Sequence, residues 1–193
     1  MTISPVHVIG AGLAGCEAVT QLTRHGIPVI LHEMRPVKSD EAHKTAYFAE
    51  LVCSNSLRAG NIENAVGLLK EEMRRLGSLI MQKADEHQVP AGGALAVDRD
   101  GFAAAVTEAV KANPLVTVIH EEVTNLESLE GTVIVASGPL TSASVGQRMS
   151  SPSRRKKAWV SPGSVSTAAR KFRQLWQAQR YGTLPRAFSA GFV

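Results

Sequence analysis

One segment near the N-terminus constrains the fold of this chain more than any other. Residues 6–9 are β-prone, residues 10–15 read Gly-Ala-Gly-Leu-Ala-Gly, and an amphipathic helix pattern follows up to His25-Gly26. A second apolar run, residues 29–31, leads to Glu33. This order of strand, glycine turn, helix, strand and acid predicts a βαβ unit that binds a dinucleotide.

The glycine turn has a physical reason at each position. In this fingerprint the first glycine makes the tight turn, the second lets the backbone approach a pyrophosphate, and the third lets helix and strand pack closely. The phosphates are expected at the positive end of the helix. The candidate cofactor-binding residues of the turn are therefore Gly10, Ala11, Gly12, Leu13, Ala14 and Gly15.

Glu33 is the candidate acid for the ribose. It lies eighteen residues after Gly15, at the end of the second strand, where it is placed to accept hydrogen bonds from a ribose 2′-hydroxyl. A carboxylate there disfavours a 2′-phosphate. The acid fits FAD and NAD equally well, so the residues alone leave the choice between them open.

The composition fits a globular domain of ordinary size. The chain has 193 residues, 44% of them hydrophobic, and no run approaches the roughly 20 apolar residues of a membrane span. The N-terminus lacks the basic region of a signal peptide. Cys16 and Cys53 are the two cysteines and have no paired spacing. The sequence therefore predicts a reducing cytoplasm, without a disulfide framework or a metal site.

Beyond Glu33 the pattern alternates between helices and strands. Asn64 is expected to cap one long helix reaching about Glu86. Its apolar stripe, which includes Leu69, is expected to face the core, and its charged face, which includes Lys70, the solvent. Another helix is expected to start at Asp98 or Asp100 and to include residues 102–111, and strands are expected over 94–97, 116–119, 122–126 and 133–136. This alternation predicts an α/β fold with a doubly wound, mostly parallel sheet, whose ligand lies beyond the C-terminal ends of the strands.

Five longer motifs resemble one family. They are His-Glu-Met-Arg-Pro at 32–36, the segment 42–56 that ends in Cys-Ser-Asn-Ser, and the runs 64–73, 90–99 and 138–142. In this order they resemble the flavin- and folate-dependent tRNA (uracil-5-)-methyltransferases, the TrmFO type, over about residues 5–142. The resemblance implies a Rossmann-like FAD-binding domain over residues 1–142, here incomplete.

The resemblance also implies an activity. Methylenetetrahydrofolate would supply a one-carbon unit to C5 of a uridine in the T loop of tRNA, and flavin reduced by NADH or NADPH would supply the hydride. The enzyme would be cytoplasmic, with tRNA as partner and neither membrane nor metal; the oligomeric state stays open. By analogy with related flavoproteins, Val123 would contact the adenine through its backbone, and Ser137 and Gly138 would close over the dinucleotide.

Cys53 matches the family cysteine implicated in catalysis next to the flavin. A thiolate is a competent nucleophile toward C6 of a uracil or an activated methylene when neighbouring donors or a cation lower its pKa. A free cysteine is otherwise a small buried apolar residue. Cys16, on the buried face of the first helix, is interpreted as packing. His43 and Arg58 are candidates for binding folate or phosphate, with surface or capping roles equally compatible.

The composition changes near residue 141. Residues 1–140 carry 11 Lys/Arg against 17 Asp/Glu, a net charge of −6, whereas residues 141–193 carry 10 Lys/Arg and no acid. The tail, residues 143–193, does not match the family motifs. It reads as a flexible basic arm for RNA phosphates or, in the interpretation we favour, as disordered or frame-shifted sequence on a truncated copy of the gene. Activity of the chain itself is therefore uncertain.

Two other functions stay open at this level. One is a non-catalytic remnant that binds a nucleotide, because the sheet of a flavin domain is often completed by a later part of the chain. The other is a related flavoprotein that modifies a different tRNA uridine.

Overall fold

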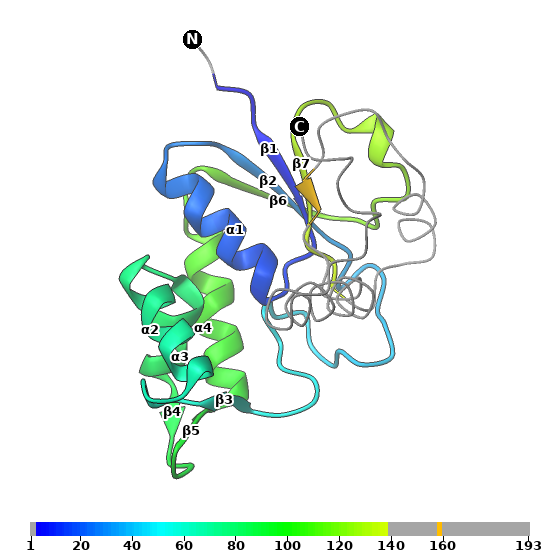
Figure 1. Ribbon diagram of the computed structural model, residues 1–193. Coiled ribbons are helices and arrows are strands. Elements are labelled where there is room, and N and C mark those ends of the chain that lie inside the picture. Colours follow the sequence, from blue (N-terminus) through cyan, green and yellow to red (C-terminus); the bar gives the residue numbers. More distant parts are fainter. Residues whose placement is uncertain (1–2, 139–157, 160–193) are drawn as a thin grey trace, which may run out of the picture.

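A parallel sheet forms the centre of the molecule (Figure 1). The computed structural model describes residues 3–138 and 158–159. Five parallel strands follow the order β6-β2-β1-β7-β8. The strands are β1 (Val6–Ile9), β2 (Val29–Glu33), β6 (Val116–His120), β7 (Val133–Val135) and β8 (Ala158–Trp159). The predicted α/β fold with a mostly parallel sheet is confirmed.

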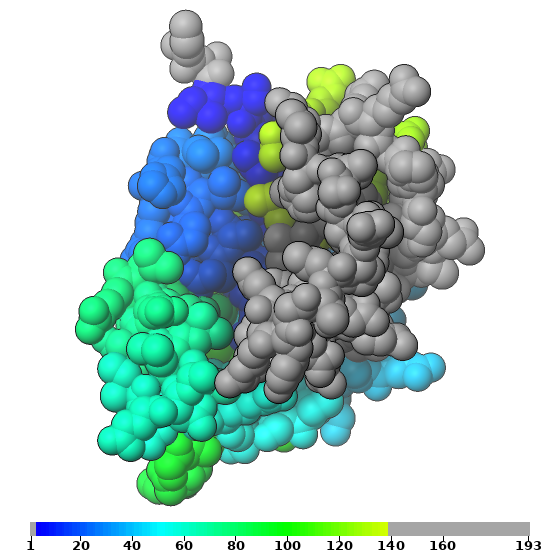
Figure 2. Space-filling model, in the orientation of Figure 1, coloured from blue at the N-terminus to red at the C-terminus, as the bar shows by residue number. Residues whose placement is uncertain are grey.

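Four helices lie on one side of this sheet in Figure 1. They are α1 (Leu13–Arg24), α2 (Ala65–Arg75), α3 (Leu79–Glu86) and α4 (Arg99–Lys111). Because side chains alternate across a strand, Val8 and Leu31 point to the helices and pack in the main core with Val19 and Val106. Each such buried aliphatic side chain contributes about 1.5–3 kcal/mol. In Figure 2, α1 (blue) and the α2–α3 region (blue-green) form the left side of the molecule.

The opposite face of the sheet has a smaller core. Ile9, Val133 and Val135 pack there against Val123 and Leu126, which belong to the crossover from β6 to β7. This crossover contains a short 3-10 helix, η1 (Leu126–Ser128), where a strand was predicted over residues 122–126. The strand prediction is wrong because these residues cross over the sheet instead of pairing with it, although Val123 and Leu126 are buried as strand residues would be.

A second, three-stranded antiparallel sheet lies at the lower end of the molecule in Figure 1. Its order is β3-β5-β4, with β3 (Ser56–Ala59), β5 (Ala94–Val97) and β4 (Gln88–Val89). The strand over 94–97 was predicted. β3 was not, and it anchors the chain directly after the Cys53 segment.

The long helix predicted from Asn64 to Glu86 is two helices. The Asn64 side chain caps α2 as expected, but α2 ends at Arg75. Gly77, with a φ of +71°, separates the two helices, and the Ser78 side chain caps α3 by accepting from the Met81 N–H. α2 also differs from the prediction in the face that it turns toward the core. Leu69 is 55% exposed, whereas Lys70 is buried and donates through Nζ to the carbonyls of Ala59 and Val66.

Two further predictions concern membranes and the tail. Within residues 3–138 and 158–159, no helix is long and apolar enough to cross a membrane. Of the tail over 143–193, only Ala158 and Trp159 belong to the described part, where they pair with Ile134 and Val135 of β7. The predicted disorder or frame shift of the other tail residues lies outside the described residues.

Candidate functional site

A cavity of about 310 Å³ lies at the C-terminal ends of the parallel strands. It is lined by the residues that end or follow β1, β2, β6 and β7, together with part of the loop after β2. Nine of the predicted cofactor residues line it: Gly10, Ala11, Gly12, Leu13, Ala14, Glu33, Val123, Ser137 and Gly138. The tenth, Gly15, lies behind the lining in α1.

The glycine turn has the geometry expected of its residue types. Gly10 has φ +96°, which favours glycine, and its N–H donates to the His32 carbonyl at 2.8 Å. A Cβ on Gly10 would lie 2.7 Å from the Cα of Ser137. A Cβ on Gly15 would collide with the Gly10 carbonyl. The turn therefore needs glycine for close packing at two of its three positions.

The N-terminus of α1 opens into the cavity. Its N-cap is Gly12, in extended backbone, and no side chain caps the helix. A Cβ on Gly12 would have nothing within 4 Å among the described residues. The first N–H groups of an α-helix have no partner within the helix, and together with the helix dipole they favour an anion. This end of α1 is therefore suited to a phosphate group.

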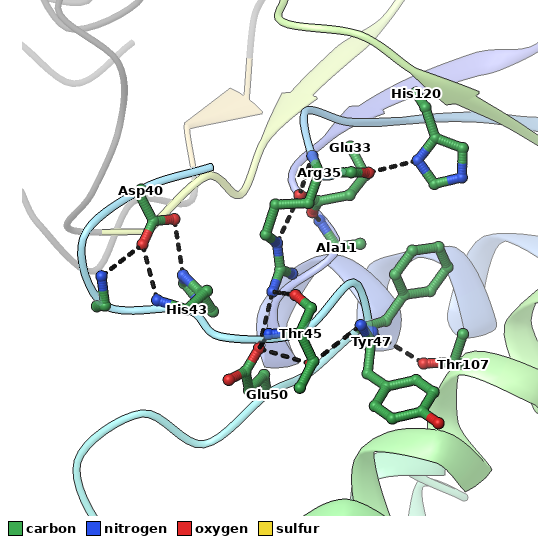
Figure 3. A network of polar contacts seen from close by, with 12 residues as sticks. Ala11, Glu33, Arg35, Asp40, His43, Thr45, Tyr47, Glu50, Thr107 and His120 are labelled. Atoms are coloured by element: carbon green, nitrogen blue, oxygen red, sulfur yellow. Dashed lines mark hydrogen bonds and ion pairs between the residues drawn. The ribbon is translucent and has the colours of Figure 1, made fainter. Parts of the chain in front are cut away.

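Glu33 is buried and hydrogen-bonded on both oxygens (Figure 3). Oε2 accepts from the Ala11 N–H at 2.8 Å, and Oε1 accepts from the Arg35 N–H at 3.0 Å and from Arg35 Nε at 2.9 Å. Burial by itself would raise the pKa of the Glu33 carboxyl. The hydrogen bonds and charge of Arg35, with the Ala11 N–H, outweigh burial and hold the pKa below its ordinary value. Glu33 is therefore an ionised acceptor at neutral pH.

Arg35 connects Glu33 to the loop that follows β2. Its Nη1 donates to the Thr45 carbonyl and to Glu50 Oε2, both at 3.2 Å. Glu50 also accepts from the N–H groups of Lys44 and Thr45 and from the Thr45 hydroxyl. These contacts tie the loop to the end of β2, as Figure 3 shows. Sequence reasoning missed Arg35 and Glu50 as site residues, because an arginine and a glutamate fifteen residues apart carry no pattern.

Two other polar groups line the cavity. The Asp40 carboxylate bonds His43 Nδ1 at 2.7 Å and accepts from the N–H groups of Ala42 and His43. On the other side, buried His32 bonds Glu121 through Nδ1 and His7 through Nε2. Of the two candidates for binding folate or phosphate, His43 lines the cavity, whereas Arg58 is exposed on β3 and is not part of the lining.

The two cysteines have opposite environments. Cys16 is fully buried in α1, and burial, with the charge of Glu33 adding to it, raises the pKa of its thiol to about 12. This agrees with a packing role. Cys53 is exposed, and it follows Glu50 and Val52, which line the cavity, but is not itself part of the lining.

This contrast predicts the thiol chemistry of the folded chain. We expect an aromatic disulfide reagent at about pH 8 to label Cys53 rapidly and Cys16 only after denaturation, because a buried thiol with a raised pKa supplies almost no thiolate. The chromophore released per chain measures the labelling. The Cys53→Ser variant is the control: rapid labelling of this variant in its native state would contradict the prediction.

Glu33 predicts a loss of stability in acid. Because its pKa in the folded chain lies below the ordinary value of 4.5, the ionised carboxylate stabilises the fold at neutral pH, and this contribution disappears as the pH falls through the folded pKa. In urea titrations between about pH 5 and pH 3, the free energy of unfolding should fall more steeply for the native chain than for Glu33→Gln. Glu63→Gln, at an exposed position, should keep the native slope. Equal slopes for the native chain and Glu33→Gln would refute the role assigned to Glu33.

A family model described as Glucose inhibited division protein A (GIDA) matches residues 5–187. A curated relative from Brucella anthropi, named methylenetetrahydrofolate--tRNA-(uracil-5-)-methyltransferase TrmFO, is 63% identical over 147 residues, covering 75% of this chain and 31% of the relative. A relative of the same name from Desulforamulus reducens is 52% identical over 191 residues, covering 97% of this chain and 43% of the relative.

These alignments define how much of the relatives the chain represents. It spans less than half the length of either one. The family model and the Desulforamulus alignment both extend past residue 142, so the boundary expected there from the motifs is not visible in them. Among solved structures, a GidA-related protein from Thermus thermophilus is 18% identical, with a TM-score of 0.41 over 72% of this chain and 54% of that one.

Proposed function

Because the chain belongs to the Glucose inhibited division protein A family, we propose that it supplies the FAD-binding part of a tRNA uracil-5-methyltransferase. The main support for this proposal is the cavity, which is lined both by the N-terminus of α1, where no side chain caps the helix, and by the ionised carboxylate of Glu33. The complete enzyme would act in the cytoplasm on C5 of a uridine in the tRNA T loop, with methylenetetrahydrofolate and NADH or NADPH as co-substrates.

The described residues fit the ADP portion of FAD. The amides at the start of α1 would bind the pyrophosphate, and the open space beside Gly12 gives the phosphates room to approach the backbone. Glu33 would accept a ribose hydroxyl. The cavity is also lined by Val123, proposed to contact the adenine, and by Ser137 and Gly138, proposed to close over the dinucleotide.

In this mechanism the chain would bind and orient FAD, and the exposed thiol of Cys53 would react with the uracil. FAD, when bound and reduced, would supply the hydride that converts a folate-derived methylene into a methyl group. The Cys53 thiolate would attack C6 of the uracil, which makes C5 nucleophilic toward the one-carbon unit. C5 would bond to the methylene carbon as the bond from that carbon to a folate nitrogen breaks and tetrahydrofolate leaves. After C5 has lost its proton, addition of a hydride to the one-carbon unit would form the methyl group and expel the thiolate from C6. The short separation in sequence between Cys53 and the cavity residues Glu50 and Val52 supports this role.

The test is FAD binding by the purified chain, followed by methylation. We expect flavin absorbance bands to remain with the protein after gel filtration, and little methyl transfer to tRNA, because the chain covers less than half of its relatives. In a full-length relative, replacing the matching cysteine by serine should abolish transfer and keep the flavin. If the chain folds but binds no FAD, the proposal is overturned. If the chain binds FAD but the cysteine substitution in the relative leaves methyl transfer unchanged, nucleotide binding is the only role that remains supported.

A further inference from the structure

We propose that Arg35 is a positioning residue for the dinucleotide: its guanidinium, held between Glu33 and Glu50, fixes the Glu33 carboxylate so that one oxygen accepts a ribose hydroxyl. The inference rests on the FAD-binding function proposed above and adds a residue that the glycine fingerprint does not contain. Arg35 lines the cavity and its side chain is only 5% exposed.

The geometry of the guanidinium is the first argument. One edge, through Nε, donates to Glu33 at 2.9 Å, and Nη1 donates to Glu50 and to the Thr45 carbonyl at 3.2 Å. A planar guanidinium can bond two acidic partners in fixed directions, which a lysine ammonium, as a point charge, cannot do. Arg35 therefore joins the end of β2 to the loop that leads to Cys53, and it fixes the plane of the Glu33 carboxylate.

The hydrogen-bond capacity of Glu33 is the second argument. Each carboxylate oxygen has two acceptor positions. Both positions of Oε1 are filled by the N–H and Nε of Arg35, whereas among the described residues Oε2 accepts one hydrogen bond, from the Ala11 N–H. One acceptor position of Oε2 is therefore available, and it lies beside the glycine turn. Arg35 thus determines which oxygen of Glu33 is offered to the ribose.

The positive charge of Arg35 also acts on Glu33. Burial opposes ionisation of Glu33, and Arg35 is the main group that offsets it. Without the Arg35 guanidinium, only the N–H groups of Arg35 and Ala11 still oppose the effect of burial, so the pKa of Glu33 should rise. Its ionised form would then be an uncompensated negative charge beside both Glu50 and the pyrophosphate. Loss of Arg35 should therefore weaken FAD binding more at high pH than at low pH.

Other titratable groups surround this pair and must be separated from it. Those on the neighbouring elements are Cys16 of α1, His32 of β2, His120 of β6, Asp40 and His43 of the loop, and Glu121 after β6. All of them are the same in the native chain and in variants at positions 33 and 35. A change in the pH profile between these proteins therefore reports on Glu33 and Arg35.

The experiment is calorimetric titration of FAD into the 193-residue chain between about pH 6 and pH 8. Native affinity should be nearly constant. Arg35→Met should bind at least about tenfold more weakly at pH 8 and recover at least about threefold at pH 6, since one unit of pKa corresponds to a tenfold change. Arg35→Lys should give a flat profile with weaker binding. The double variant Arg35→Met/Glu33→Gln should lose the pH dependence, because the titrating group is gone.

The controls separate this inference from the proposed function. Arg75→Met removes an arginine that is 77% exposed and paired with Glu71, and it should bind FAD as the native chain does. Far-UV circular dichroism checks folding. If Arg35→Met does not fold, Arg35→Lys decides: native affinity in this variant overturns the inference. The inference is also overturned if Arg35→Met binds FAD with native affinity, or if its affinity is weakened by the same factor at every pH. A native chain that binds no FAD overturns the proposed function itself.

Discussion

Replacing Gly12 by valine is expected to abolish FAD binding by this chain while leaving its fold intact. Gly12 has φ −73° and ψ −173°, a conformation open to any residue, and a Cβ there meets nothing within 4 Å of the described residues. The cost to stability should stay near 1 kcal/mol, the usual loss when a good N-cap residue is replaced. The side chain would, however, occupy the space at the N-terminus of α1 where we place the pyrophosphate.

The expected loss of affinity is at least a hundredfold. This corresponds to about 2.7 kcal/mol, which is reasonable when a side chain prevents amides and phosphate from approaching each other. Calorimetric titration measures the affinity, and thermal unfolding shows that the variant is folded. Gly93→Ala is the matched control, because a Cβ at Gly93 also meets nothing and the residue does not line the cavity. Binding by Gly12→Val within tenfold of the native chain would contradict the placement of the pyrophosphate.

Replacing Gly15 by alanine should have the opposite pattern and destabilise the chain without any ligand. The added Cβ would collide with the Gly10 carbonyl oxygen and lie 3.0 Å from the Gly10 carbonyl carbon. Neither side can move freely: Gly10 donates to the His32 carbonyl, and the preceding Ile9 carbonyl accepts from Ala136. Separating α1 from β1 would open the core at its centre.

We expect Gly15→Ala to cost about 3 kcal/mol or more, at the upper end of overpacking effects. That is a large part of the 5–15 kcal/mol by which ordinary domains are stable. Urea unfolding of the FAD-free chain measures it, with Gly12→Val as the comparison within the same turn. A Gly15→Ala chain as stable as the native one would show that α1 and β1 are not in the close contact described here.

The local pattern between residues 6 and 33 could be interpreted from sequence because its causes are local. Gly10 needs a positive φ, Gly15 needs to be small, and Glu33 ends a strand that pairs with β1. Parallel strands then bring their C-terminal ends to one edge of the sheet, so the convergence of Gly10, Glu33 and Gly138 on one cavity follows from the alternation of strands and helices.

The segment that forms α2 and α3 shows where the pattern of apolar residues gave a wrong prediction. Apolar spacing predicted that Leu69 would face the core and Lys70 the solvent, and the reverse is found. Gly67 packs its Cα against the backbone of Asn61, and the Lys70 ammonium bonds two carbonyls, so these contacts set the rotation of α2. The break at Gly77 removes the continuity on which the stripe was based. Periodicity measures amphipathicity along one helix, but it does not say which neighbours the helix meets.

The βαβ unit, the glycine turn, the position of the acid and the parallel sheet could be predicted from sequence, because each depends on residues close together in the chain or on strand order. The tertiary structure was needed to show that Arg35 bonds Glu33 and Glu50, that Cys53 is exposed, and that α2 turns Lys70 inward. The physical reason is that burial and hydrogen bonding depend on which groups meet in space. Segments far apart in sequence bring those groups together only when the whole domain has packed.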